Sequence, residues 1–445
     1  MGLVKSSTFS GGIHPPENKR SSGLKIEKCP LPAQVVIPVQ QHIGAPAAPI
    51  VNKGDEVKAG QVIAEPSGFV SVPAHASISG KVVAVEERPH PLGKPVMSVV
   101  IENDGNDEWV ALESRSLEQA LEMDPKDMVG RIRNAGIAGM GGATFPTHVK
   151  LSPPPDKPID TLILNGVECE PFLTSDHRLM LEEPEKILHG VQLIARILKV
   201  KRIVIGIESN KPDAIKLLKR WTADLKLPFE VISLHVKYPQ GAEKQLIKAV
   251  TGRFVPAGGL PMDIGCVVQN VGTAAAVYDA LVEGKPLVER IVTITGDGVS
   301  QPKNLSVRIG ASYQHVFEQC GGLKENAGKI IMGGPMMGMA QSSVEAPVIK
   351  GTSGLLVLNE KQSSKRREDN CISCARCVDV CPMGLLPKFL AAYVKNDRFD
   401  LTEKFNVLDC IECGSCSYVC PAHINLVHWI KFGKQQVIKS RKKAG

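Results

Sequence analysis

Residues 371–382 read CISCARCVDVCP, and residues 410–421 repeat the pattern as CIECGSCSYVCP. Each copy spaces its cysteines as Cys-x2-Cys-x2-Cys-x3-Cys-Pro, and the two copies hold eight of the chain's 12 cysteines. A disulfide framework would spread its cysteines over the loops of a small secreted domain. Clustering in a long chain without an apolar signal core instead indicates metal binding. The predicted ligands are Cys371, Cys374, Cys377, Cys381, Cys410, Cys413, Cys416 and Cys420.

Two kinds of metal centre use Cys-x2-Cys pairs. Structural zinc needs neither the third x2 cysteine nor the Cys-Pro ending, whereas 4Fe–4S clusters use the complete pattern. We therefore favour two 4Fe–4S clusters over two zinc ions. In two-cluster ferredoxins the fourth cysteine of each run ligates the other cluster. By that rule one cluster takes Cys371, Cys374, Cys377 and Cys420, and the other takes Cys410, Cys413, Cys416 and Cys381.

The composition excludes several classes of protein. At 445 residues, 43% hydrophobic and 22% charged, the chain is a multidomain globular protein, not a disordered or fibrous one. Aromatic residues make up only 4%, which argues against a stacking surface for nucleic acid. The longest stretch free of Asp, Glu, Lys and Arg, residues 29–52, contains five prolines and is not a spanning helix. We expect a soluble chain that stays in the compartment where it is made.

Four successive patterns predict four domains. Residues 1–115 are β-rich, 116–285 alternate helices with apolar strands, 286–358 return to short strands, and 359–445 hold the cysteines and a basic tail. Within 116–285 the expected helices span 117–134, 184–198, 211–225 and 243–250, and the expected strands span 161–164, 202–207 and 229–234. The predicted fold class is therefore multidomain, α/β and α+β. The interval between the cysteine runs has a helical pattern at 385–394, which resembles the all-helical dicluster ferredoxins.

The first domain contains VNKGDEVKAGQVIAE at 51–65, which resembles the half-repeat of a biotinyl/lipoyl-type barrel-sandwich hybrid. In that family a lysine in the exposed turn carries the cofactor. The stretch that follows here, residues 65–69, has no lysine. We interpret the module as structural or for docking, not as a swinging arm.

A glycine-rich loop, GIAGMGGATFP at 136–146, follows a predicted helix. Glycines let backbone N–H groups approach phosphates and flavin edges closely. As a dinucleotide fingerprint the loop is poor, because Thr144 replaces the third glycine and no strand precedes it. Taken alone, it is as compatible with a structural turn as with a ligand site.

The acidic loop NGVECEP at 165–171 follows a predicted strand, and α/β sheets bind ligands beyond the carboxyl ends of their strands.

Together these loops resemble the flavin-bearing, NADH-oxidising subunit of respiratory complex I. This chain departs from the family's pattern at three positions. Met140 replaces the arginine between the first two glycines, Thr144 replaces the fourth glycine, and Val167 replaces the first aspartate of the acidic loop. Residues 296–335 are similar to the family's β-grasp, soluble-ligand-binding (SLBB-like) module. The matching loop residues are Gly139, Gly141, Gly142, Phe145, Pro146, Thr147, Lys150, Asn165, Glu168, Glu170, Pro171, Asn270 and Thr273.

The complete order, from barrel through Rossmann-like FMN/NADH domain and β-grasp module to dicluster tail, resembles the C subunits of Rnf complexes. So does the opening GGIHPP at 11–16. The resemblance implies FMN, NAD(H) and two 4Fe–4S clusters in a peripheral subunit of a membrane-bound, ion-translocating ferredoxin:NAD⁺ oxidoreductase, on the cytoplasmic face of the inner membrane. The partners it implies are the other subunits, with ferredoxin as a further candidate.

The resemblance also implies residue roles. Phe145 would stack on adenine or nicotinamide, and Lys150 would pair with a phosphate. Glu168 and Glu170, the predicted catalytic residues, would bracket flavin and nicotinamide. Two alternatives remain open at this stage: a flavin/iron–sulfur reductase of another acceptor, such as the cobalamin reductases, and a docking subunit that has lost nucleotide binding. The direction of electron flow and the translocated ion are not decided by the sequence.

Overall fold

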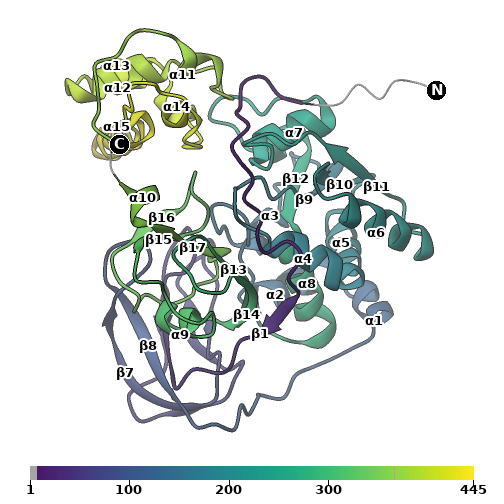
Figure 1. Cartoon of the computed structure of the whole chain (residues 1–445). Coiled ribbons are helices and arrows are strands. Elements are labelled where there is room, and N and C mark those ends of the chain that lie inside the picture. Colours follow the sequence, from purple (N-terminus) through teal and green to yellow (C-terminus); the bar gives the residue numbers. More distant parts are fainter. Residues whose placement is uncertain (1–7, 365, 445) are drawn as a thin grey trace.

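The computed structural model describes residues 8–364 and 366–444, which form four sheets and, at the C-terminal end, a helical domain (Figure 1). The central sheet has the order β11-β10-β9-β12, and all its pairings are parallel. Parallel strands covered on both faces have near-continuous apolar runs, as residues 162–164 of the central sheet do. The carboxyl ends of all four strands therefore lie at one edge. The strands are β9 (Thr161–Gly166), β10 (Arg202–Glu208), β11 (Phe229–Leu234) and β12 (Cys266–Asn270).

Helices cover this sheet and position its loops. A helix expected over residues 117–134 is two helices, because Asp124 caps a new start at Pro125. Helices α5 and α8 approach so closely that a Cβ on Gly190 would lie 1.9 Å from the carbonyl oxygen of Ala274. The helices are α1 (Leu117–Glu122), α2 (Pro125–Asn134), α3 (Thr147–Lys150), α4 (Ser175–Glu182), α5 (Pro184–Leu198), α6 (Pro212–Asp224), α7 (Glu243–Thr251), η1 (Pro261–Ile264), α8 (Val271–Tyr278) and η2 (Asp279–Glu283).

The N-terminal barrel has two sheets around an apolar core that includes Val35, Ile37 and Ile63. Their strand orders are β2-β8-β7-β4 and β3-β5-β6. The buried lysine Lys350 ties this barrel to the central domain, since its Nζ donates to the carbonyls of Pro73 and Gly136 at 2.9 and 2.7 Å. The strands are β2 (Gln34–Pro38), β3 (Ala47–Pro49), β4 (Glu56–Val57), β5 (Val62–Pro66), β6 (Ala74–His75), β7 (Gly80–Arg88) and β8 (Val96–Asn103).

The third unit is a six-stranded mixed sheet with the order β1-β14-β13-β17-β15-β16. Its edge strand β1 comes from the N-terminal part of the chain and pairs in parallel with β14. This strand lies within residues 1–115, which the sequence assigns to the barrel module, yet it pairs with the sheet of the third unit. The sequence lacked a signal for it, because a three-residue edge strand has no periodicity of its own. The elements are β1 (Ile26–Lys28), β13 (Glu289–Thr295), β14 (Lys303–Arg308), α9 (Tyr313–Glu318), β15 (Ala327–Met332), β16 (Met339–Gln341) and β17 (Gly354–Asn359).

Residues 11–24, here called the N-terminal strap, run from the cysteine domain along the central domain toward β1, in dark purple in Figure 1. The strap crosses the carboxyl edge of the central sheet. Ile13 exchanges backbone hydrogen bonds with Tyr238, and the N–H of Phe172 donates to the carbonyl of Glu17 at 2.8 Å. The strap thus fixes loops that follow two different strands.

The C-terminal domain is helical, as expected, and packs around Leu390, Val407 and Ile430. The basic tail continues its last helix. Within the described ranges, none of the helices is both long and apolar enough to cross a membrane. The helix α10 (Glu360–Ser363) contacts β15 and β17 of the six-stranded sheet. The helices of the C-terminal domain are α11 (Arg376–Asp379), α12 (Pro387–Lys395), α13 (Phe399–Lys404), η3 (Val407–Asp409), α14 (Ser415–Tyr418) and α15 (Leu426–Ala444).

Candidate functional site

The glycine-rich loop folds back on itself between α2 and α3. The N–H of Gly139 donates to the carbonyl of Phe145 at 2.8 Å, and the N–H of Met140 donates to the hydroxyl of Thr273 at 3.0 Å. Gly142 has a φ of 72°, in the left-handed region that glycine tolerates best. The hydrogen bond from Met140 to Thr273 attaches the loop to the first turn of α8.

Asn270 joins the glycine-rich loop to both neighbouring helices. Its Oδ1 caps α8 by accepting from the N–H of Gly272 at 2.7 Å, and its Nδ2 donates to Asp176 at 2.6 Å. A Cβ on Gly141 would lie 3.2 Å from this Nδ2, so a small residue belongs there. The predicted residues Gly141, Asn270 and Thr273 therefore meet at one place.

The two glutamates of the acidic loop have separate partners. Glu168 is buried, and its carboxylate accepts from the hydroxyl of Ser175 at 3.2 Å and from the N–H groups of Asp176 and His177 at 3.0 and 3.3 Å. These are the first residues of α4, where a carboxylate satisfies donors that have no partner within the helix. Asn165 holds the start of the same loop by donating to the carbonyl of Gly241 at 2.9 Å.

Glu170 points to the six-stranded sheet's side of the site. Its carboxylate accepts from the N–H groups of Met336 and Met337 at 3.1 and 2.8 Å. Burial raises the pKa of Glu170 to about 7, although these two hydrogen bonds act in the opposite direction. Near neutral pH this carboxyl is therefore close to its titration midpoint.

Lys19 of the N-terminal strap is a site residue that sequence reasoning missed. Its buried Nζ donates to the carbonyls of Glu168, Glu170 and Leu173 at 2.7, 2.8 and 2.6 Å. Burial lowers its pKa, and the nearby Glu168 carboxylate opposes that change. The lysine thus holds the acidic loop through its backbone, and its only sequence signal is its place shortly after the GGIHPP motif.

Lys150 lies at the end of α3 and is half-buried. Its Nζ pairs with the carboxylate of Glu243 at 2.7 Å and donates to the carbonyl of Val268 at 3.2 Å. Glu243, the first residue of α7, was not predicted, because a single glutamate at a helix start has many ordinary uses. Phe145, near the end of the glycine-rich loop, is half-buried.

Asp176 is a further residue that the sequence did not mark. Burial raises its pKa, and the neighbouring Glu168 carboxylate raises it further. The hydrogen bond from Asn270 partly offsets that change. Two buried carboxyl groups thus lie side by side at the carboxyl edge of the central sheet.

The residues at this edge fit a phosphate-bearing flavin. Both amide atoms of the buried Gln240, and Nε2 of the buried Gln269, have no hydrogen-bond partner in the described part of the chain. Buried polar groups normally have partners, so amides left without them indicate a polar ligand. The closely approached glycines and the capped start of α8 supply the backbone surface that a phosphate needs.

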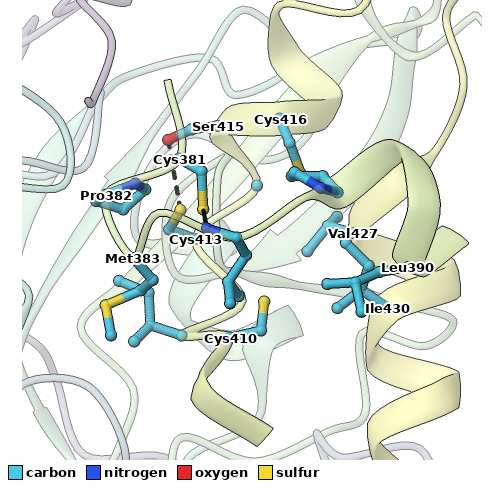
Figure 2. A pocket seen from close by; sticks show the side chains of 14 residues that line it. Cys381, Pro382, Met383, Leu390, Cys410, Cys413, Ser415, Cys416, Val427 and Ile430 are labelled. Atoms are coloured by element: carbon cyan, nitrogen blue, oxygen red, sulfur yellow. Dashed lines mark hydrogen bonds between the residues drawn. The ribbon is translucent and has the colours of Figure 1, made fainter. Parts of the chain in front are cut away.

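One set of four cysteines lines a single pocket in the C-terminal domain (Figure 2). Cys381 comes from the first run and the other three from the second run, which is the crossed grouping that the spacing predicts. The N–H groups of Leu385 and Glu412 donate to the sulfurs of Cys381 and Cys410 at 3.3 and 3.4 Å. Such bonds to sulfur tune the potential of a bound cluster. We call Cys381, Cys410, Cys413 and Cys416 the inner set.

The outer set, Cys371, Cys374, Cys377 and Cys420, differs in exposure. Cys371 and Cys374 are exposed, whereas Cys377 and Cys420 are half-buried. Burial raises the pKa of Cys377, and the thiols of Cys420 and Cys371 add to this effect, which places all three close together. The eight thiols and the cavity between four of them fit two clusters.

The inner set faces the rest of the molecule. The hydroxyl of Tyr238 donates to the carbonyl of Cys413 at 2.8 Å. A Cβ on Gly414 would lie 3.0 Å from the carbonyl of Met336, and one on Gly11 would lie 2.8 Å from the carbonyl of Cys381. The central domain, the turn that holds Glu170 and the strap therefore all touch the inner set.

Four family models match the chain in the order of its domains. They are the RnfC barrel sandwich hybrid domain over residues 7–106, the Nuo51 FMN-binding domain over 132–279, the SLBB domain over 291–340 and a 4Fe-4S dicluster domain over 363–424. A relative from Acetobacterium woodii, named as the C subunit of a Na⁺-translocating ferredoxin:NAD⁺ oxidoreductase complex, is 51% identical and covers 99% of each chain. The chain belongs to the RnfC family.

Two further relatives give the range within this family. The C subunit of a proton-translocating ferredoxin:NAD⁺ oxidoreductase complex from Clostridium ljungdahlii is 50% identical, over 98% of this chain and 94% of the relative. The C subunit of an ion-translocating oxidoreductase complex from Rhodobacter capsulatus is 41% identical, over 97% and 83%. The fold is also similar to that of an NAD⁺-reducing [NiFe]-hydrogenase, with a TM-score of 0.50 and 18% identity over 74% of this chain and 64% of the hydrogenase chain.

Proposed function

We propose that this chain is the NAD(H)-reactive, peripheral subunit of an ion-translocating ferredoxin:NAD⁺ oxidoreductase complex. The observation that carries the proposal is the continuity of the sites. The glycine-rich loop, the acidic loop and the start of α8 meet at one edge of the central sheet. The acidic loop then reaches the turn at 336–337, which contacts the inner set of cysteines.

The residues have distinct roles in this proposal. When bound, a flavin would supply the exchange between two-electron hydride transfer and one-electron transfer. Asn270, Thr273 and the backbone of Gly139, Gly141 and Gly142 hold it, and Lys150 binds a phosphate of the nucleotide. Phe145 borders the nicotinamide side. Asn165, Glu168 and Glu170 shape the acidic loop that brackets the flavin and the nicotinamide.

The cluster that the inner set would hold is proposed to exchange electrons with the flavin, and the cluster that the outer set would hold to exchange electrons with a partner. The difference in exposure supports this order, because the inner set is enclosed by Tyr238, Met336 and the strap, whereas Cys371 and Cys374 are exposed. A one-electron path needs each carrier near the next, and it needs the last one near the surface. The exposed partner is another subunit of the complex or ferredoxin.

We propose that the subunit lies on the cytoplasmic face of the cell membrane, held by contacts with its partners. At 1 M salt the distance over which exposed charges attract one another falls to about 3 Å, so attachment by surface charge alone is lost. Retention on membranes that hold the other subunits after such a wash is expected, and complete release would contradict protein contacts with apolar cores. The ion stays open, because relatives of 50% and 51% identity are named for different ions.

Lys150→Ala tests the nucleotide site. Removing a charge-assisted contact with a phosphate costs about 1.5–3 kcal/mol, so the KM for NADH should rise roughly ten- to a hundredfold. The measurement is NADH-dependent reduction of an artificial acceptor by the full-length, anaerobically purified chain. Lys157→Ala is the control, because this lysine also forms an ion pair, with Asp263 at 2.6 Å, on the exposed surface.

A third variant, Glu243→Gln, distinguishes a nucleotide-binding role of Lys150 from a structural role. If Lys150 serves only its ion pair with Glu243, Glu243→Gln and Lys150→Ala should lower the unfolding temperature alike and leave the KM for NADH unchanged. That result would contradict the nucleotide site. Absence of flavin and of NADH-dependent reduction in the unmodified chain would instead favour the docking-subunit alternative, and faster reduction of cobalamin than of ferredoxin would favour the reductase alternative.

A further inference from the structure

Arg290 is a buried guanidinium with few hydrogen-bond partners. It lies on β13 and is 6% exposed. Its Nη1 contacts the sulfur of Met140, its Nη2 lies 3.5 Å from the carbonyl oxygen of Met140, and its Nε has no partner among the described residues. Guanidinium has five N–H donors, and burying a cation with weak acceptors is costly unless an anion compensates. An anionic partner is therefore missing from the described side chains at this point.

The guanidinium lies where the proposed flavin site has its phosphate-binding features. A Cβ on Gly272, in the first turn of α8, would lie 3.7 Å from Nη1 of Arg290 and 3.3 Å from the sulfur of Met140. The same turn is capped by Asn270, which Gly141 approaches from the other side. The start of a helix favours an anion, and here a second, independent cationic group points to the same place.

One acidic neighbour balances this charge only in part. Asp176 raises the pKa of Arg290, but burial outweighs it and brings that pKa to about 10, so the guanidinium remains charged at neutral pH. Asp176 is already held by the amide of Asn270, and its own pKa is raised by burial and by Glu168. No hydrogen bond joins the carboxyl of Asp176 to the guanidinium within residues 8–364 and 366–444. The cation can therefore accept a further anionic partner.

We propose that Arg290 is the cationic contact for the phosphate group of the bound flavin. The inference rests on the proposed function, because it requires FMN at this edge of the central sheet. The complex I relatives have an arginine in the glycine-rich loop where this chain has Met140. Here the guanidinium reaches the same loop from the neighbouring module. Arg290 also lies outside the segments 132–279 and 291–340 that the flavin and SLBB family models match.

A comparison of two flavins tests this contact. FMN and riboflavin differ only in the phosphate, so both are titrated, by quenching of flavin fluorescence, into the full-length chain after its flavin is removed. In Arg290→Met the affinity for FMN should fall about ten- to a hundredfold, while that for riboflavin stays unchanged. Adding Met140→Arg to Arg290→Met should restore much of the preference for FMN. Arg308→Met is the control, since this buried arginine on the adjacent strand pairs with Asp107 at 2.8 Å and should leave the FMN-to-riboflavin ratio as it is.

Equal loss of both flavins, or an unchanged FMN-to-riboflavin ratio, in Arg290→Met would overturn the contact while leaving the proposed function in place. If Arg290→Met does not fold, Arg290→Lys keeps a charge without the planar fork, and it should reduce the preference for FMN by a smaller factor. A wild-type preference in that variant would contradict the proposal. Failure of the unmodified chain to bind either flavin would overturn the proposed function and this inference together.

Discussion

Glu168 and Glu170 are two residues apart, yet they act in different units of the molecule. Glu168 completes the start of α4, whereas Glu170 binds the backbone at 336–337 beside the inner cysteines. The sequence marked both as site residues through the acidic motif. The sequence could not assign the partners of either glutamate. Ser175 lies 7 residues from Glu168 and Met336 lies 166 residues from Glu170, and neither belongs to a motif. Lys19, which holds the loop from the strap, was missed for the same reason.

Glu170→Gln should make stability less dependent on pH. The pKa of the folded-state carboxyl is about 7, above the ordinary value of 4.5, so the folded protein binds more protons than the unfolded chain between these pH values. The contribution of this carboxyl to the free energy of unfolding is fully present below pH 4.5. It is lost as the pH rises through about 7, and the loss amounts to up to about 3 kcal/mol. Thermal unfolding midpoints, measured anaerobically from pH 5 to 8, should therefore fall less in the variant than in the wild type.

The variant also replaces one acceptor of a backbone N–H by an amide, which costs stability at every pH, so the pH dependence of the unfolding midpoint is informative and its absolute value is not. Glu325→Gln, at an exposed carboxyl of the same module, should keep the wild-type slope. An unchanged slope in Glu170→Gln would mean that this carboxyl does not change its ionisation in the range.

Elements with a strong pattern were predicted closely, and elements fixed by tertiary contacts were not. The strand over 229–234 and the helix over 184–198 match their expected bounds. Helices α4 and α8 were not expected, although both begin at the site. Their sequences are short or rich in small residues, and their starts are stabilised by Glu168 and Asn270 from neighbouring elements. Apolar periodicity cannot reveal helices of only eight residues, and the carboxylate of Glu168, which accepts from the start of α4, lies outside that helix.

Gly190→Ala should destabilise the protein because the added Cβ would lie 1.9 Å from the carbonyl oxygen of Ala274 on α8. Helices packed this closely must move apart, at a cost of about 1–3 kcal/mol, and flavin affinity should fall because α8 carries Asn270 and Thr273. Gly130→Ala is a matched control inside α2, where a Cβ would meet nothing within 4 Å. It should stabilise by about 0.5–1 kcal/mol. Equal changes in the unfolding midpoints of the two variants would contradict the close packing of α5 on α8.

At the scale of the molecule, the sequence predicted the order of the four units. The crossed ligand sets stay a prediction, with Cys381, Cys410, Cys413 and Cys416 lining one pocket. The sequence did not predict how the units are joined. The strap, the turn at 336–337 and the buried Lys350 connect them through backbone carbonyls and N–H groups, which have no residue signature. These joints matter for the proposed electron path, because they bring the acidic loop to the inner cysteines and leave Cys371 and Cys374 exposed.

Cys420→Ser and Cys381→Ser test this arrangement together. Crossed ligation means that Cys420→Ser should damage the cluster of Cys371, Cys374 and Cys377, and that Cys381→Ser should damage the cluster of Cys410, Cys413 and Cys416. If electrons pass from the flavin through the inner cluster to the outer cluster, NADH should still reduce the remaining cluster in Cys420→Ser, but transfer to partner subunits or ferredoxin should be lost.

In Cys381→Ser the outer cluster should assemble and accept electrons from an artificial donor, yet NADH should no longer reduce it at the wild-type rate. Iron content and anaerobic electron paramagnetic resonance after NADH addition measure both outcomes. Damage confined to the cluster of each cysteine's own run would contradict the crossed ligand sets, and unimpaired NADH reduction of the outer cluster in Cys381→Ser would reverse the proposed order.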